Sequence, residues 1–280
     1  MEPSSSLPLR TLILGGTTEA TNIARALAHE PTIAATLSLA GRTAAPILPP
    51  IPHRIGGFGG IAGLVAYLRT TETAAIIDAT HPFAAQISDH ACQAAALTAT
   101  PILRIDRPAW RAEPGDQWTH VTTMTQAADA LGPMPRRVFL TIGQQDLAPF
   151  RAAPWHDYII RSVDPPAAAL CPPNAELITA RGPFTVAGET ALLQTHRIDI
   201  IVTKNAGAAA TSAKLTAART LGIPIIMIAR PSLPPCPTVP DADGALDWLK
   251  REVSTARQAS IAVKRSEKTS FFEKKEAKKL

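Results

Sequence analysis

Short apolar segments without an alternating polar pattern recur along the chain, and Ala-rich helical segments separate them. In the first part of the chain, strands are predicted at residues 9–14, 33–39, 74–78 and 101–105, and helices at residues 17–28, 60–69 and 84–97. Strands that are apolar on both faces and alternate with helices are typical of a parallel sheet covered on both sides. Because βαβ connections are right-handed, this order predicts a doubly wound α/β fold.

The pattern pauses over residues 106–135, which are rich in Pro, Gly, Trp and polar side chains, and this composition predicts a domain junction. Beyond it, strands are predicted at residues 137–141, 158–163, 176–179, 199–203 and 225–228, and helices at residues 186–195, 212–221 and 243–253. We therefore predict two Rossmann-like lobes, with parallel sheets flanked by helices and a crevice between them. The predicted parts are a cofactor-binding domain at 1–110, a second α/β domain at 111–255 and a disordered tail at 256–280.

The net charge of +5 resides in the end of the chain. Residues 251–280 contain nine Lys and Arg against four Asp and Glu, so residues 1–250 are neutral. Only 5% of the residues are aromatic. A neutral body with few aromatic side chains argues against a surface that follows phosphates or stacks bases, so no nucleic-acid partner is predicted.

The three cysteines are far apart and form no Cys-x-x-Cys pair, so no zinc site or other metal site is predicted. A sparse, odd number of cysteines is typical of a reducing compartment, and we expect a cytoplasmic protein. The first residues lack the basic segment of a signal peptide. No uncharged apolar run reaches the roughly 20 residues that span a bilayer, so no membrane partner is predicted.

The first predicted strand leads into Leu-Gly-Gly-Thr-Thr-Glu-Ala, residues 14–20, which opens a helix. At such a turn, free N–H groups and the helix dipole can hold a phosphate, and the hydroxyls of Thr17 and Thr18 can add donors. The turn departs from the Gly-x-Gly-x-x-Gly pattern, because Thr17 and Ala20 occupy the second and third Gly positions. A tight turn that needs Gly only for its backbone conformation is the alternative.

The end of the second strand bears on which dinucleotide would bind. An NAD site places a carboxylate there for the ribose hydroxyls. This chain has no Asp or Glu between Glu30 and Glu72, and has Ser38, Arg42 and Thr43 at the strand end. A guanidinium beside hydroxyls suits a ribose 2′-phosphate, which indicates NADP(H). A solvated loop arginine is the alternative for Arg42 taken alone.

Two further segments follow predicted strands or precede helices in this half. In the Gly-rich run 55–60, Phe58 either lines a cofactor face or fills the core. The run Asp-Ala-Thr-His-Pro-Phe, residues 78–83, ends a strand at the edge where parallel sheets bind ligands. His81 carries an imidazole, the side chain that ordinarily titrates near neutral pH. Helix capping by Asp78 and Thr80 is the alternative to a catalytic site.

Basic side chains also follow predicted strands in the second half. Arg181, Lys204 and Lys214 lie at or just beyond strand ends, where they can collect the carboxylates of an acidic ligand. Each of them taken alone is more often a solvated charge.

Several catalytic signatures are missing. The sequence has no Gly-Lys-Ser/Thr of a P-loop and no Gly-x-Ser-x-Gly elbow. Neither tyrosine has a lysine four residues later, since Thr71 and Ser162 stand there. Reduction of a carbonyl by a Tyr/Lys pair is therefore not expected, and reduction of a conjugated C=C or C=N bond fits better.

Together these runs resemble the precorrin-6A reductase family of cobalamin biosynthesis. The runs that carry the resemblance are Leu-Ile-Leu-Gly-Gly-Thr-Thr-Glu-Ala (12–20), Ala-Gly-Arg-Thr (40–43), Gly-Gly-Phe-Gly-Gly (56–60), Asp-Ala-Thr-His-Pro-Phe-Ala (78–84), Arg-Gly-Pro-Phe (181–184) and Val-Thr-Lys-Asn-Ala-Gly (202–207). The resemblance implies an oxidoreductase that uses NADPH to deliver a hydride to the ring of precorrin-6A, giving precorrin-6B. A cobalt-bearing ring, another NADP-dependent reductase or epimerase, and a non-catalytic NADP(H)-sensing protein are the alternatives.

The candidate residues fall into three groups. The expected catalytic residues are His81 and Asp78. The residues expected to hold the cofactor are Gly15, Gly16, Thr17, Thr18, Glu19, Ser38, Gly41, Arg42, Thr43, Gly57, Phe58 and Thr80. The residues expected to hold the tetrapyrrole substrate are Arg181, Lys204, Asn205 and Lys214. We expect a monomer or a weak homo-oligomer.

Overall fold

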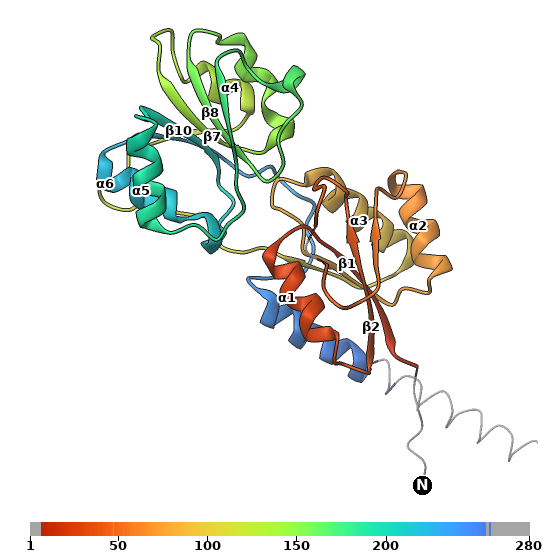
Figure 1. Ribbon diagram of the computed structural model, residues 1–280. Helices are drawn as coiled ribbons and strands as arrows, with labels where there is room; N and C mark the ends of the chain where they lie inside the picture. The colour runs from red at the N-terminus through yellow and green to blue at the C-terminus, as the bar shows by residue number, and fades with distance from the viewer. Residues whose placement is uncertain (1–6, 47, 256–257, 259–280) are drawn as a thin grey trace, which may run out of the picture. The chain divides into compact units, whose positions relative to one another are not determined.

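The computed structural model describes residues 7–46, 48–255 and 258 (Figure 1). Contacts between Cα atoms divide the described chain into two units. Unit 1 contains the residues up to Arg42, the range Pro46–Asp106 and the residues from Leu233 onward. Unit 2 contains Thr43–Ala45 and Arg107–Ser232. None of the helices in the described ranges is long and apolar enough to cross a membrane.

Unit 1 is built on a parallel sheet with the strand order β12-β5-β4-β1-β2-β3. Its strands are β1 (Leu9–Leu14), β2 (Ile33–Leu39), β3 (His53–Ile55), β4 (Ala75–Asp78), β5 (Ile102–Ile105) and β12 (Thr238–Val239). Its helices are α1 (Thr18–Leu27), α2 (Gly60–Thr70), α3 (Ala85–Thr98) and a last helix over residues 242–255. The direction of winding reverses between β1 and β4, and ligands of such sheets bind beyond the strand ends at this point.

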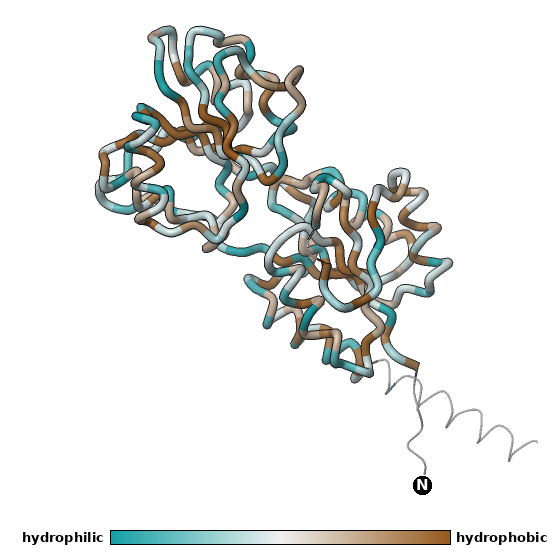
Figure 2. The backbone as a smooth tube through the Cα atoms, viewed as in Figure 1, coloured by the Kyte–Doolittle hydropathy of each residue, from teal (hydrophilic) through white to brown (hydrophobic). Residues whose placement is uncertain are grey.

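Both faces of the unit 1 sheet are covered. On one face, Ile13 of β1 belongs to a core cluster with Ile23 of α1 and Leu249 of the last helix. On the other face, Leu12 and Leu14 pack with residues of α2 and α3. Figure 1 shows α1 and the blue last helix on one side of the strands and α2 and α3 on the other. This double burial explains the uninterrupted apolar strands, which are brown in Figure 2.

Unit 2 repeats the plan with the order β6-β11-β10-β7-β8-β9. Its strands are β6 (Trp118–Val121), β7 (Arg137–Thr141), β8 (Asp157–Ser162), β9 (Ala175–Thr179), β10 (Ile200–Lys204) and β11 (Ile225–Ile228). Its helices are α4 (Met124–Asp129), α5 (Val186–Thr195), α6 (Ala213–Leu221) and the 3-10 turns η1 (Gln144–Asp146), η2 (Ala148–Ala152), η3 (Ala168–Leu170) and η4 (Ala209–Thr211). Phe139, Ile201 and Leu215 belong to its core.

The sixth strand of each sheet comes from an unexpected part of the chain. β6 follows β5 in sequence but pairs with β11 in unit 2. β12 follows β11 but pairs with β5 in unit 1. The chain therefore leaves unit 1 after Asp106, builds all of β6 to β11, and returns at Leu233 to complete the first sheet.

The predicted fold class, with two Rossmann-like parallel sheets flanked by helices, is confirmed. The residues are grouped differently from the predicted ranges. The segment 106–135 holds β6 and α4 as well as a connection, and the last helix belongs to unit 1 because Ala245, Leu249 and Val253 fill its core. The predicted tail, 256–280, lies outside the described residues apart from residue 258.

Candidate functional site

The turn after β1 has the geometry of an anion cradle. A Cβ on Gly15 would lie 2.6 Å from Leu37 Cδ1, so a larger residue here would require the Leu37 side chain to move. Gly16 has a φ of +120° and faces open space, which leaves its backbone accessible. Thr17 caps α1 by accepting a hydrogen bond from the Ala20 N–H at 3.2 Å. A helix N-terminus that follows a strand in this way can hold an anion through its backbone N–H groups and the helix dipole.

Hydrogen bonds bring this turn together with two other strand ends. The Thr17 hydroxyl donates to the Ala79 carbonyl beyond β4 at 2.8 Å. The Gly15 N–H donates to the Ser38 carbonyl of β2 at 2.9 Å. The structure therefore gathers the predicted residues of β1, β2 and β4 at one edge of the sheet. The Thr17 hydroxyl was expected to donate to a phosphate, but it donates to the Ala79 carbonyl instead. Thr18 is exposed, and Glu19 lies in the first turn of α1.

Asp78 at the end of β4 is held by protein groups. Its side chain is 1% exposed, and Oδ2 accepts a hydrogen bond from Arg104 Nε at 3.1 Å. Oδ1 accepts from the Thr80 hydroxyl at 2.7 Å. Both carboxylate oxygens of Asp78 are therefore engaged by protein donors. These contacts favour the capping and structural role for Asp78, and they turn the Thr80 hydroxyl inward.

His81 is held differently. Its Nδ1 accepts a hydrogen bond from the Phe83 N–H at 3.2 Å, which places the proton of a neutral imidazole on Nε2. The ring is half-buried next to that of Phe83. The geometry therefore gives His81 an Nε2–H donor near the end of β4.

The loop after β2 separates residues that were predicted to act together. Ser38 is buried at the strand end, and Arg42 is exposed. Gly41 adopts a φ of +75° between them. Thr43 groups with unit 2, where the neighbouring Ala44 N–H donates to Asp164.

Sequence reasoning missed Arg54 on β3. Its Nη1 donates to the Ser38 hydroxyl at 2.8 Å, and its guanidinium carbon lies 3.9 Å from the centre of the Phe58 ring. The sequence does contain a signal for Arg54, because this arginine stands next to the Gly-rich run and within the stretch that lacks Asp and Glu.

The Gly-rich run before α2 serves two purposes. Gly57 faces open space and leaves its backbone accessible. Phe58 packs edge-on against Tyr67 at 5.2 Å between ring centres and joins the core formed with α2 and α3. These contacts favour the core-filling alternative for its ring.

The predicted substrate residues of unit 2 do not form one open cluster. Asn205 is occupied, since Oδ1 accepts from the Trp110 N–H at 2.7 Å and Nδ2 donates to the Trp110 carbonyl at 3.0 Å. Lys204 is paired with Asp146. Arg181 is exposed and donates to the Ala45 carbonyl at 3.1 Å.

Lys214 lies in a buried charged cluster with Arg161 of β8 and Glu189 of α5. Its side chain is 3% exposed, and Nζ donates to the Thr211 carbonyl at 2.7 Å. Burial, assisted by the charge of Arg161, lowers the pKa of Lys214 to about 7, while Glu189 opposes the shift. Such burial is more consistent with organising unit 2 than with meeting a ligand at the surface.

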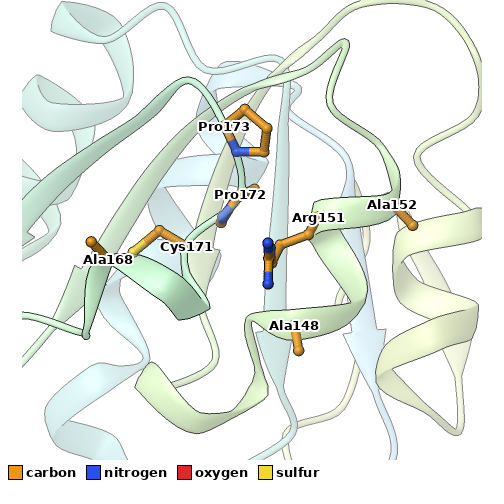
Figure 3. A pocket seen from close by; sticks show the side chains of 7 residues that line it. All are labelled: Ala148, Arg151, Ala152, Ala168, Cys171, Pro172 and Pro173. Atoms are coloured by element: carbon orange, nitrogen blue, oxygen red, sulfur yellow. The ribbon is translucent and has the colours of Figure 1, made fainter.

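An open depression of about 570 Å³ lies elsewhere in unit 2, between η2 and the segment before β9 (Figure 3). It is lined by Ala148, Arg151, Ala152, Ala168, Cys171, Pro172 and Pro173, none of which is a predicted site residue. In the part of the chain that the structure describes, no group of three or more His, Cys, Asp or Glu side chains is placed to hold a metal ion.

Comparison with known proteins relates this geometry to a family. The family model described as Precorrin-6x reductase CbiJ/CobK matches residues 10–250. The chain belongs to the precorrin-6x reductase family. The precorrin-6A reductase of Rhodobacter capsulatus is 49% identical over 248 residues, which are 89% of this chain and 98% of that protein. The precorrin-6A reductase of Rhodococcus erythropolis is 49% identical over 241 residues, 86% of this chain and 97% of that one.

A solved structure of CobK precorrin-6A reductase superposes with a TM-score of 0.83 at 49% identity, covering 87% of this chain and 96% of that chain. The predicted family and fold class are therefore confirmed, and this member of the precorrin-6x reductase family is an oxidoreductase of cobalamin biosynthesis. A reductase of this kind requires a hydride donor, for which a nicotinamide cofactor is the general solution.

Proposed function

We propose that this chain uses NADPH to reduce precorrin-6A to precorrin-6B, and that the cofactor binds at the strand ends of unit 1. The observation that carries the proposal is the accessible Gly16 turn at the reversal point between β1 and β4, beside a β2 end that offers cations and no carboxylate. NAD sites need an acidic residue at that place. The absence of Asp and Glu between Glu30 and Glu72 therefore favours the phosphorylated cofactor.

The residues present fit such a cofactor. Gly15, Gly16 and the first N–H groups of α1 would hold the pyrophosphate. Ser38 and Arg42 would meet the ribose 2′-phosphate, and the open backbone of Gly57 would border the cofactor. When bound, NADPH supplies the hydride. The chain's contribution is to fix the reacting carbons about 3–3.5 Å apart.

His81 is the proposed proton donor of unit 1. Addition of a hydride to one atom of a double bond leaves the other atom to be protonated, and the Nε2–H of His81 is a group able to donate there. Arg181 and Lys204 are proposed to meet substrate carboxylates, whereas the contacts of Asn205 and Lys214 favour supporting roles. We propose that the enzyme works in the cytoplasm as a monomer or a weak homo-oligomer.

The direct test is a spectral assay with purified precorrin-6A. We expect NADPH to be oxidised in step with the change in the visible spectrum of the ring, and NADH to be a much poorer donor. Parallel assays with metal-free and cobalt-bearing substrate separate the two ring states. Binding of NADPH without turnover of either ring would instead support a sensing protein, and turnover only of another acceptor would support a different reductase.

A second prediction concerns Arg42. Replacing Arg42 with Ala should weaken NADPH binding by about 10-fold or more, because a charge-assisted contact with the 2′-phosphate is lost. NADH, which lacks that phosphate, should bind almost as before. Titration calorimetry with both cofactors measures the two affinities, and equal losses would show that Arg42 does not read the phosphate.

A further inference from the structure

Arg54 is a cation whose position is fixed before any ligand binds. It lies on the edge strand β3, directly opposite Ser38 of β2 in the parallel register. Its Nη1 donates to the Ser38 hydroxyl at 2.8 Å and to the Gly56 carbonyl at 2.9 Å, and its Nη2 donates to the Gly57 carbonyl at 2.8 Å. An arginine on an edge strand is ordinarily solvated, so three such bonds mark this side chain as unusually ordered.

Aromatic rings support the same guanidinium. The Phe58 ring centre lies 3.9 Å from the guanidinium carbon, and the Tyr67 ring centre lies 5.5 Å from it. Stacking on an aromatic face holds an arginine in one orientation and costs it little hydration. The side chain thus loses little further freedom when an anion arrives.

The positive charge of Arg54 is not balanced by a paired carboxylate in the part of the chain that the structure describes. Among the described residues, no carboxylate forms an ion pair with it, and the sequence has no Asp or Glu from residue 31 to residue 71. A guanidinium has five N–H donors, and the three hydrogen bonds above leave two of them for a ligand. The Ser38 hydroxyl accepts from Arg54, so its own proton remains available to the same ligand.

Arg54 lies where a dinucleotide ribose is expected, at the end of β2. The Ser38 carbonyl accepts the Gly15 N–H, so Arg54 connects through one residue to the turn proposed to hold the pyrophosphate. A parallel sheet of this order receives the ribose of a dinucleotide at the end of β2. A fixed, unbalanced positive charge at that point matches a phosphate carried on the ribose.

We propose that Arg54 determines the preference for NADPH over NADH by contacting the ribose 2′-phosphate, together with Ser38. This inference rests on the proposed function, since it assumes that the cofactor binds at the β1 and β2 strand ends. It assigns the fixed cation to Arg54 and leaves Arg42 as an exposed second cation on the following loop.

The test compares Arg54→Gln and Arg54→Lys with the full-length wild-type protein by titration calorimetry. The probes are NADPH, NADH, adenosine 2′,5′-bisphosphate and adenosine 5′-monophosphate. We expect Arg54→Gln to weaken NADPH and the bisphosphate by about 10- to 100-fold, with NADH and the monophosphate changed by less than about threefold. Arg54→Lys should restore part of the difference, because it keeps the charge but loses the planar contacts.

Arg69→Gln is the matched control, because it removes one exposed arginine from α2 in the same unit. It should leave all four affinities unchanged. If Arg54→Gln weakens all four probes equally, Arg54 merely supports the Gly-rich run and the proposal is overturned. If the wild-type protein itself binds NADPH no better than NADH, the proposed cofactor is wrong as well. A wild-type preference for NADPH that survives Arg54→Gln overturns the role of Arg54 alone.

Discussion

Replacing Glu189 with Gln is expected to lower the free energy of unfolding of unit 2 by about 3–5 kcal/mol. Glu189 and Arg161 form a two-pronged ion pair, with side chains 3% and 5% exposed. The Arg161 guanidinium also lies over the Phe184 ring at 3.7 Å, which fixes it away from water. Without the carboxylate, a buried charge would remain unpaired next to Lys214.

The same substitution should show a dependence on pH. The pKa of Lys214 is lowered by burial from 10.5 to about 7, so between these values the unfolded chain holds a proton that the folded protein has released. The free energy of unfolding therefore rises with pH through this window. Because Glu189 also stabilises the protonated form of Lys214, its loss should cost more at pH 6 than at pH 9.

Urea unfolding at the two pH values measures both effects. Tryptophan fluorescence is a suitable probe, since Trp110, Trp118 and Trp155 all belong to unit 2. The matched control is Glu176→Gln, which makes the same change at an exposed carboxylate of unit 2, 3.4 Å from His196 Nδ1, and should cost at most about 0.5 kcal/mol. A loss for Glu189→Gln as small as the control would mean that Arg161 reaches water.

Replacing Gly63 with Ala should destabilise unit 1 by about 3 kcal/mol or more, although Ala is ordinarily the better helix former. A Cβ at this position would lie 1.7 Å from the Phe58 carbonyl oxygen, so the backbone of the Gly-rich run must move. Phe58 supports Arg54 and the core of α2 and α3, and NADPH binding should weaken with it.

Gly57→Ala separates the loss of stability from the loss of NADPH affinity. Its Cβ would face open space, so unfolding followed by circular dichroism should change by less than about 1 kcal/mol. Cofactor affinity is then the sensitive measurement, because an added methyl group would narrow the proposed approach to the backbone. If Gly63→Ala unfolds like the wild-type protein, the backbone at Phe58 can move away from the added Cβ without lowering the free energy of unfolding, and the prediction is wrong.

The strands that sequence analysis missed are the ones at the sheet edges. β3 and β12 end the sheet of unit 1, and β6 ends that of unit 2. Edge strands are covered on fewer sides, and Trp118–Val121 is correspondingly half-exposed and polar. The central strands were predicted within a residue or so, because burial on both faces requires continuous apolar runs.

The candidate site was predictable to a similar extent. Strand ends and Gly-rich turns located Gly15, Gly16 and Ser38, because a parallel sheet brings its carboxyl ends to one edge. The side-chain partners could not be predicted from local pattern. The Asp78–Arg104 pair joins residues 26 positions apart, and only the packing of β4 beside β5 brings them together.

The path of the chain has a consequence for synthesis on the ribosome. Unit 1 is begun first, yet β5 gains its outer neighbour and the α1 face gains its last helix only after every strand of unit 2 has been translated. A nascent chain that stops before Thr238 leaves an open edge and an uncovered apolar surface, which are the features that recruit chaperones and promote aggregation. Unit 2, whose strands are synthesised later than those that begin unit 1, is thus the first unit whose sheet can be completed.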